Sequence, residues 1–192
     1  MQFFYHYGII TLWLIWGLYW LAASFSVKAV RRQEAVPSRL SHMLPLALAA
    51  VLLSSRRIAG PYLCVSLLPH TLITFWVGVV LVAVGIVFSI AGRVCLGGNW
   101  SGTVTLKENH ELVRRGPYRL VRHPIYTGLL FGVLGTAIAQ GELRSLLALA
   151  LIAVAFLRKI GIEESFLTEE FGNSYERYRS EVPALIPFLR QI

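Results

Sequence analysis

Long apolar segments alternate with short basic segments along the chain. Residues 8–27 and 71–91 are each long enough for a helix to cross the ~30 Å hydrocarbon core of a bilayer, which takes about 20 residues. A shorter apolar segment, residues 41–55, lies between them. In the second half, residues 124–140 and 145–157 flank a tight polar turn, which is typical of a helical hairpin. The pattern predicts an all-α integral membrane protein with about five transmembrane helices.

The chain after residue 163 is polar overall, but large apolar residues recur in it at spacings of three to five. This spacing predicts an amphipathic tail helix that lies on the membrane surface or on the protein itself. Pro183 and Pro187 end the predicted helix. Its apolar stripe consists of Phe166, Leu167, Phe171, Tyr175, Tyr178 and Val182.

The composition agrees with a membrane protein. Hydrophobic residues make up 56% of the chain and charged residues 15%, with a mean hydropathy of +0.62. Soluble domains average roughly 45–50% apolar and about 25% charged residues. The net charge of +8 could indicate nucleic-acid binding, but the sequence contains no recognisable nucleic-acid-binding module. Cys64 and Cys95 lack metal-ligand spacing, so neither a zinc site nor a disulfide framework is expected.

The basic residues predict an orientation in the membrane. They follow the first, third and fifth predicted spans, which all end on one side, so this side is predicted to be cytoplasmic and the N-terminus to lie outside. Arg56 and Arg57 break the rule: either they snorkel at the outer interface or the second span is misplaced. The residues on the predicted cytoplasmic side are Lys28, Arg31, Arg32, Arg39, Arg93, Arg114, Arg115, Arg119, Arg122, Arg158 and Lys159.

Residues 115–128, RGPYRLVRHPIYTG, combine prolines, tyrosines, arginines and a histidine at the start of an apolar run. Pro124 suits the first turn of a helix, where its missing N–H costs no hydrogen bond. His123 would then lie beside unpaired backbone donors, which favour an anionic ligand group. The alternative is a positive-inside membrane anchor in which Tyr118 and Tyr126 belong to the aromatic belt.

A second polar group follows the last apolar run. Glu163 and Glu164 lie within two helical turns of it, close to Arg158 and Lys159. Membrane topology does not favour carboxylates at a cytoplasmic span end, so these residues are candidates for a ligand site. The alternative is charge pairing along a helix, for instance between Lys159 and Glu163 at i, i+4.

Taken together, these polar segments resemble the isoprenylcysteine carboxyl methyltransferase family, including its prokaryotic and phospholipid methyltransferase-like relatives. The matching stretches are GGNWSG, HELVRRGPYRLVRHPIYTG, EESFLTEEFGNSYERY and VPALIPF, between residues 97 and 188. An RHPxYxG element separated by a helical hairpin from an EE…FG tail is a specific combination. The resemblance implies that residues 97–192 form a cofactor-binding catalytic region with the hairpin and the tail helix. Residues 1–96 would then hold about three transmembrane helices.

The resemblance implies S-adenosylmethionine as the cofactor, bound without a Rossmann fold, and the chain has no G-x-G-x-x-G motif after a strand. Lys159 falls where eukaryotic members place an arginine that serves the substrate. The implied cofactor-binding residues are Thr105, His110, Glu111, Leu112, Val113, Tyr118, His123, Pro124, Ile125, Tyr126 and Glu163. The implied catalytic or substrate-guiding residues are Arg122, Arg158, Lys159 and Glu164, and no metal is implied.

The chemistry of these side chains suits that cofactor. Glu163 can accept hydrogen bonds from its ammonium or ribose hydroxyls, and the helix start at His123 can hold its carboxylate. Tyr118 and Tyr126 can stack on adenine or face the sulfonium. The expected acceptor is the carboxylate of an isoprenylcysteine-like or other amphiphilic molecule, reached from the membrane lipids. An ionised carboxylate needs no general base, only in-line placement and exclusion of water.

Three alternatives remain open at this point. The acceptor could be a phospholipid amine or a small thiol; an amine must lose a proton, for which His123 or Glu164 could act as the base. The chain could be an NADPH-dependent reductase like the sterol reductases, which share a similar C-terminal layout but are longer. It could also be a non-catalytic membrane protein whose arginines anchor it to lipid headgroups.

Overall fold

The computed structural model describes residues 2–25, 27–107, 111–187 and 189. Seven α-helices and two short strands make up the described part of the chain. In chain order they are α1 (Gln2–Ala23), β1 (Val30–Gln33), α2 (Val36–Ser54), α3 (Arg56–Ala59), α4 (Leu72–Leu96), β2 (Thr105–Lys107), α5 (Pro124–Gln140), α6 (Leu143–Phe171) and α7 (Asn173–Glu181). Single 3-10 turns lie at Pro61–Leu63 (η1), Gly97–Asn99 (η2) and Gly116–Arg119 (η3).

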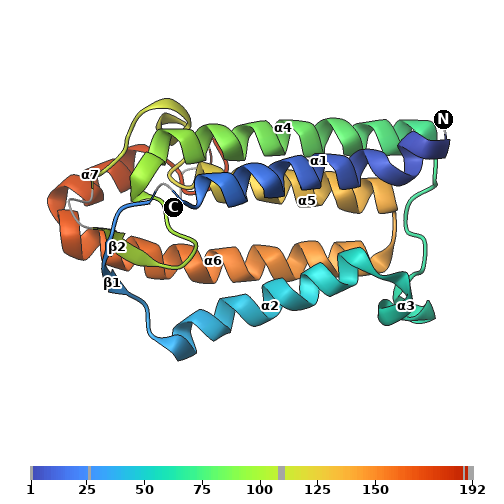
Figure 1. Ribbon diagram of the computed structural model, residues 1–192, viewed down its shortest axis with the longest axis horizontal. Helices are drawn as coiled ribbons and strands as arrows, with labels where there is room; N and C mark the ends of the chain where they lie inside the picture. The colour runs from blue at the N-terminus through green and yellow to red at the C-terminus, as the bar shows by residue number, and fades with distance from the viewer. Residues whose placement is uncertain (1, 26, 108–110, 188, 190–192) are drawn as a thin grey trace.

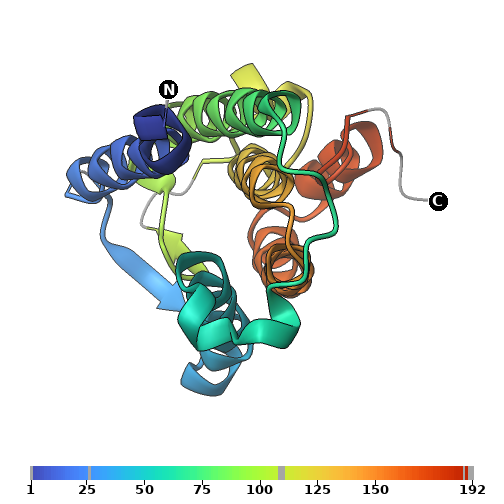
Figure 2. The same ribbon diagram turned by 90° about the vertical axis from the view of Figure 1, so that its right-hand side faces the viewer.

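The long helices run side by side along one axis of the molecule (Figure 1). The N-terminus, α3 and the turn between α5 and α6 lie at one end, whereas β1, β2 and α7 lie at the other. Viewed along the axis, α4 lies beside α1 and α5, and α6 lies between α5 and α2 (Figure 2). The most extensive helix contacts are those of α4 with α5 and of α2 with α6.

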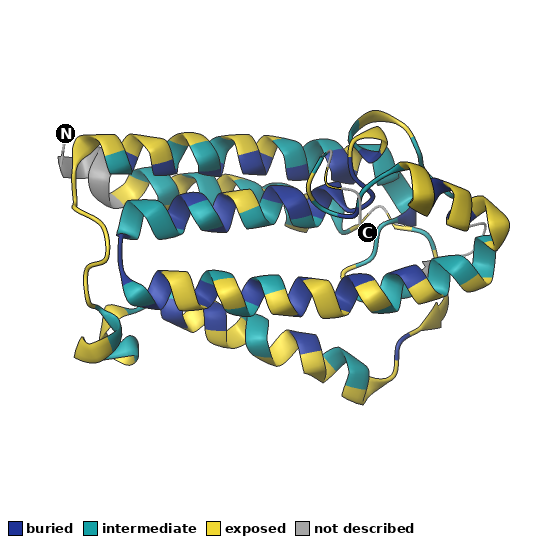
Figure 3. Ribbon diagram, turned by 180° about the vertical axis from the view of Figure 1, so that it is seen from behind, coloured by how far each residue is buried: buried dark blue, intermediate teal, exposed yellow. Residues whose placement is uncertain are grey.

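Among the described residues, three helices are long and apolar enough to cross a membrane: α2, α4 and α6. The part of α1 from Tyr7 to Ala23 and the helix α5 are shorter apolar segments. Figure 3 shows that exposed positions recur along the outer faces of these helices. Many of them are large and apolar, among them Leu18 on α1, Val87 on α4 and Val154 on α6, each more than half exposed. Apolar outer faces with internally hydrogen-bonded backbones are what a bilayer requires. The predicted helical membrane fold is confirmed, while the count of five spans stays a prediction.

Glycines allow α4 and α5 to touch backbone to backbone. A Cβ atom at Gly78 would lie 2.5 Å from the carbonyl oxygen of Gly135. A Cβ at Gly85 would overlap the carbonyl oxygen of Gly128 and the backbone nitrogen of Gly132. Small residues that permit such close approach are a common basis of helix packing in membranes. The contact fixes where α5 begins relative to the end of α4.

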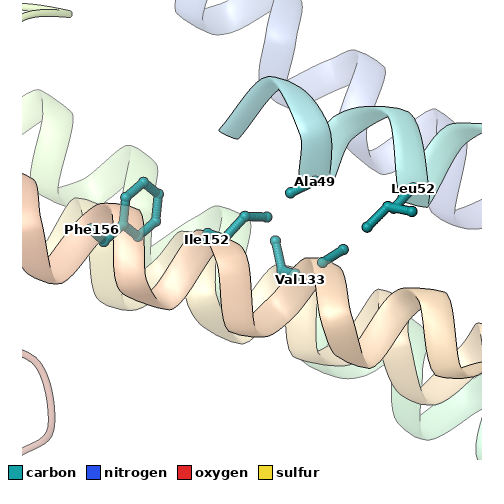
Figure 4. Packing of buried hydrophobic residues seen from close by; sticks show 6 residues of the cluster. Ala49, Leu52, Val133, Ile152 and Phe156 are labelled. Atoms are coloured by element: carbon teal, nitrogen blue, oxygen red, sulfur yellow. The ribbon is translucent and has the colours of Figure 1, made fainter. Parts of the chain in front are cut away.

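The second packing unit lies between α2, α5 and α6. Ala49 and Leu52 of α2, Val133 of α5, and Ile152 and Phe156 of α6 point toward one another (Figure 4). Ala148 completes this cluster. The cluster brings the N-terminal half of the chain onto the hairpin formed by α5 and α6.

Three segments differ from the sequence-based prediction. The amphipathic tail is not a separate helix from residue 163, because α6 continues without a break to Phe171, and only Gly172, with a φ of 49°, separates it from the short α7. Although the sequence predicts an all-α protein, the basic segment after α1 contains β1, which pairs antiparallel with β2. α2 is long enough to span because it begins at Val36, ahead of the apolar run, with a proline in its first turn.

The close contact of α4 with α5 yields a stability prediction. We expect Gly85→Ala to lower the stability of the protein by about 1–3 kcal/mol, because the added methyl group meets backbone that cannot move aside. Thermal unfolding in detergent measures the change. Gly17→Ala in α1 is the control, since a Cβ there meets nothing within 4 Å. Equal unfolding temperatures for the two variants would contradict this packing.

Candidate functional site

A cavity of about 240 Å³ lies at the end of the helix bundle that carries β2 and α7. Its wall combines α1, the connection from α4 to β2, the segment around η3, the start of α5, the middle of α6, and α7. Of the residues predicted from the sequence, the cavity is lined by Thr105, Glu111, Leu112, Val113, Tyr118, Arg122, His123, Ile125, Tyr126, Lys159 and Glu163.

The other predicted residues lie elsewhere. Pro124 is buried against the position of Gly92 in α4, so it serves helix packing. Glu164 is buried behind the cavity wall. Arg158 is exposed and donates a hydrogen bond to Ser41 Oγ at 3.3 Å. His110 falls outside the described residues.

A buried charge network joins the start of α5 to α6. Arg122 donates to Glu164 Oε1 through Nε at 2.9 Å and Nη2 at 2.7 Å. The same oxygen lies 3.1 Å from Nε2 of His123. Arg179 of α7 is a third cationic partner, with its Nε 3.5 Å from Glu164 Oε2. Because the buried Glu164 faces these three partners, its carboxylate is compensated rather than available to a ligand. Glu164 therefore fixes the side chains of Arg122 and His123, which do line the cavity.

Glu163 faces the cavity on the other side of His123. Its Oε2 lies 3.5 Å from His123 Nδ1, and its Oε1 accepts a hydrogen bond from the Tyr126 hydroxyl. The Tyr126 ring stacks on the imidazole with a centroid distance of 5.7 Å. The Glu163 side chain remains 24% exposed, so part of the carboxylate can still reach a ligand.

The charge state of His123 follows from the two carboxylates. Burial by itself would lower the pKa of its imidazole, but hydrogen bonds and charge interactions with Glu163 and Glu164 outweigh burial and raise the pKa above its ordinary value. The imidazolium therefore persists to a higher pH than in an exposed histidine.

The chain after α7 folds back over the start of α5. The backbone N–H of Arg122 donates to Pro183 O at 2.8 Å, and that of His123 donates to Ala184 O at 3.0 Å. Thr127 Oγ1 donates to Leu185 O at 2.8 Å. These bonds use the backbone donors of the two residues that precede α5 and lock the helix start in place. Binding of a carboxylate by the first turn of α5 stays a prediction.

Lys159 places a buried ammonium at the cavity wall. Its side chain is 8% exposed, and Nζ donates to Gly102 O at 2.9 Å. Nζ also lies 5.4 Å from the centre of the Tyr126 ring, within range of a cation–π interaction. Lys159 and Glu163 are one helical turn apart on α6, so a cationic and an anionic side chain lie close together in the cavity wall.

Aromatic residues that the sequence interpretation did not include also line the cavity. Trp16 and Trp20 of α1 stack with a centroid distance of 4.7 Å, and Trp20 meets Trp100 edge-on at 5.5 Å. Arg93 lies 4.6 Å from the Trp100 ring centre and donates to Ala23 O, which joins the ends of α1 and α4. Tyr175 and Tyr178 reach the cavity from α7. In the sequence, only the high density of tryptophans in the segment that forms α1 could have indicated that aromatic residues line a site.

The lining fits a ligand that carries several polar groups. Thr105 Oγ1 is buried without a hydrogen-bond partner among the described residues, as a group that awaits a ligand would be. Glu111 and Glu163 offer carboxylates for an ammonium or for hydroxyls, and aromatic rings offer surfaces for stacking. Within the described residues, no group of three or more His, Cys, Asp or Glu side chains could hold a metal ion.

A family model described as phospholipid methyltransferase matches residues 73–174. The matched region includes the residues of α5 and α6 that line the cavity. The chain belongs to the phospholipid methyltransferase family. Within this family, the chain is 41% identical over 96 residues to the protein-S-isoprenylcysteine O-methyltransferase of Schizosaccharomyces pombe, a match that covers 48% of the chain and 41% of the relative. It is 32% identical over 121 residues to protein-S-isoprenylcysteine O-methyltransferase A of Arabidopsis thaliana. This match covers 60% of the chain and 61% of the relative.

The fold of this phospholipid methyltransferase family member also has a counterpart among solved structures. The eukaryotic intramembrane Ras methyltransferase, isoprenylcysteine carboxyl methyltransferase, superimposes with a TM-score of 0.54 at 23% identity. The match covers 82% of the chain and 55% of that protein. The resemblance inferred from the sequence motifs is confirmed, and the chain spans less than two thirds of the length of the relatives it matches.

The buried histidine yields a pH prediction. Because the pKa of His123 is higher in the folded protein than in an unfolded chain, its stabilising effect is complete below about pH 6.5 and is lost as the pH rises through the folded-state pKa. We expect the difference in unfolding temperature between the wild type and His123→Gln to shrink from about pH 6 to about pH 9. The exposed His70 provides the control, as His70→Gln. A difference that grows with pH would mean that His123 is neutral in the fold.

Proposed function

We propose that this protein is an S-adenosylmethionine-dependent methyltransferase that methylates the carboxylate of an isoprenylcysteine-like or other amphiphilic acceptor. The observation that carries the proposal is the pairing, in one cavity, of the partly exposed Glu163 carboxylate with the buried Lys159 ammonium. A carboxylate suits the ammonium and hydroxyl groups of the cofactor, and an ammonium suits an acceptor carboxylate.

On the cofactor side, Glu163, Glu111 and Thr105 are the groups that would bind its ammonium and hydroxyls. When bound, S-adenosylmethionine supplies a methyl group activated by a sulfonium cation. His123 and Glu164 keep Glu163 and Arg122 in place, since both imidazole nitrogens face carboxylates. Tyr126 is held by Glu163, stacks on His123 and faces the Lys159 ammonium, so its ring links the charged groups of the cavity.

On the acceptor side, apolar residues line the same cavity as Lys159. Trp16, Leu129 and Phe156 line the cavity and would accept the lipid-like part of the acceptor. Lys159 would hold its carboxylate and, with the apolar wall, exclude water from the reacting groups. An ionised carboxylate is already a nucleophile, so no residue has to remove a proton.

The need for a base distinguishes a carboxylate acceptor from a phospholipid amine, the alternative acceptor considered from the sequence. An amine needs a base. The two bases considered from the sequence are both occupied: Glu164 is buried behind the wall with Arg122, and His123 is held between two carboxylates that favour its protonated form. The arrangement therefore favours a carboxylate acceptor. Methylation of an amine by the purified protein would contradict this assignment.

We further propose that the cavity faces the cytoplasm and that the N-terminus lies outside. The positive-inside rule supports this orientation, since most basic residues flank the cavity end of the bundle. Two basic residues at the other end have local partners: Arg56 pairs with Glu142 at 3.1 Å, and Arg144 donates to Glu142 and to Leu52 O. These two serve the fold at that end, whereas Arg57 is exposed there and remains an exception to the rule.

Removal of the Glu163 charge tests the cofactor side. We expect Glu163→Gln to weaken binding of S-adenosylhomocysteine by at least about tenfold, because it replaces a charged hydrogen-bond acceptor worth about 1.5–3 kcal/mol. Calorimetric titration in detergent measures the affinity. Glu169→Gln is the matched control, since Glu169 lies on the same helix and pairs with Arg32 at the surface. If both variants bind like the wild type, Glu163 has only a structural role.

Removal of the Lys159 ammonium tests the acceptor side. We expect Lys159→Ala to raise the KM for a farnesylated cysteine analogue by about tenfold or more while the affinity for S-adenosylhomocysteine changes less. Transfer of labelled methyl groups into the analogue gives the KM. Arg158→Ala, on the exposed side of α6, is the comparison. A larger effect of Arg158→Ala, or a larger effect of Lys159→Ala on the cofactor, would show that the acceptor end is assigned wrongly.

A further inference from the structure

A second buried acidic group lies outside the cavity lining, in a part of the chain that precedes the region matched by the family model. Glu34, between β1 and α2, is 4% exposed, and His42 of α2 is 2% exposed. Glu34 Oε1 lies 3.5 Å from His42 Nε2, and Ser38 Oγ donates to Glu34 Oε2 at 3.1 Å. Burial of a carboxylate is costly unless its hydrogen-bond partners are held in place, so this group calls for an explanation.

Glu34 holds the segment that forms one wall of the cavity. Its backbone N–H donates to Val104 O at 3.0 Å, and its side-chain Oε1 accepts from the Val104 N–H at 3.3 Å. The backbone bond extends the ladder of β1 and β2, which ends with Gln33 opposite Thr105, by one residue. The side-chain bond of Glu34 gives a second link to the residues before Thr105.

The same wall segment holds the ammonium of Lys159. Gly102, two residues before Val104, accepts a hydrogen bond from Lys159 Nζ at 2.9 Å, and both Gly102 and Val104 line the cavity. The path from Glu34 to Lys159 therefore consists of Val104, a short stretch of backbone and one hydrogen bond. A shift of this segment would move Gly102 O away from the ammonium.

We propose that Glu34, supported by His42, is a positioning residue for the acceptor end of the cavity. It fixes the wall from Gly102 to Val104 so that Gly102 O keeps the Lys159 ammonium directed at the acceptor carboxylate. This inference rests on the proposed function, in which Lys159 binds the acceptor. It gives the part of the chain before the family match a role in substrate binding in addition to its role in the fold.

Two substitutions of Glu34 test the proposal. We expect Glu34→Ala to raise the KM for the farnesylated cysteine analogue by about tenfold, while the Kd for S-adenosylhomocysteine stays within about threefold. Glu34→Gln should restore a KM within about threefold of the wild type, because its amide oxygen can still accept from the Val104 N–H. A cofactor Kd that changes as much as the KM, or a Gln variant as impaired as the Ala variant, would overturn the proposal.

Glu142→Ala is the matched control. Glu142 is equally buried, at 5% exposed, but lies at the opposite end of the bundle, where it pairs with Arg144 and Arg56. Its removal should lower the unfolding temperature in detergent but leave the acceptor KM within about threefold of the wild type. A similar rise in KM for Glu142→Ala and Glu34→Ala would mean that Glu34 acts only through general stability.

A readout that does not depend on catalysis separates this inference from the proposed function. In Glu34→Ala, the buried Lys159 amine should react at least about fivefold faster with a small amine-reactive reagent, measured by mass spectrometry, because the wall segment opens locally. Glu142→Ala should leave the rate unchanged. Faster labelling in a protein that does not bind S-adenosylhomocysteine would uphold the link between Glu34 and Lys159 and reject the methyltransferase. An unchanged labelling rate would reject the link itself.

Discussion

The carboxylate of Glu164 lies in a helix apolar enough to span a membrane, and it has to be neutralised by partners inside the protein. Arg122 and His123, just before α5, supply this compensation together with Arg179 of α7. Arg122 also donates to the carbonyl groups of Arg179 and Val182, so the tail of the chain is drawn to the same point. One buried charge thereby holds α5, α6 and the segment after α7 in the arrangement that shapes the cavity.

The cavity is assembled from both halves of the chain. The second half provides the charged groups on α5 and α6. The first half provides Trp16 and Trp20, and it supports the wall before β2 through Glu34. The glycine contact between α4 and α5 sets the distance between these parts. Fold and site are therefore linked, since the helices that bury apolar surface also place the polar groups.

The sequence was sufficient to predict the helical membrane fold, the hairpin of α5 and α6, and a set of polar residues most of which the structure brings to one cavity. Periodicity and the RHPxYxG element carry that information. The side each residue faces could not be predicted. Neighbours on a helix point about 100° apart, so Glu163 lines the cavity and Glu164 does not, and Lys159 is buried whereas Arg158 is exposed. The strand pairing of β1 with β2 depends on contacts 70 residues or more apart, which no local pattern reveals.

S-adenosylmethionine, rather than a nicotinamide cofactor, is the proposed ligand of this cavity. Calorimetric titration of the purified protein in detergent with S-adenosylhomocysteine, beside NADPH, is the direct test. We expect micromolar binding of S-adenosylhomocysteine and no binding of NADPH. Binding of NADPH alone would assign the cavity to a reductase. Binding of neither by folded protein would contradict the proposed function, and would leave a protein that shares the family's architecture without its activity.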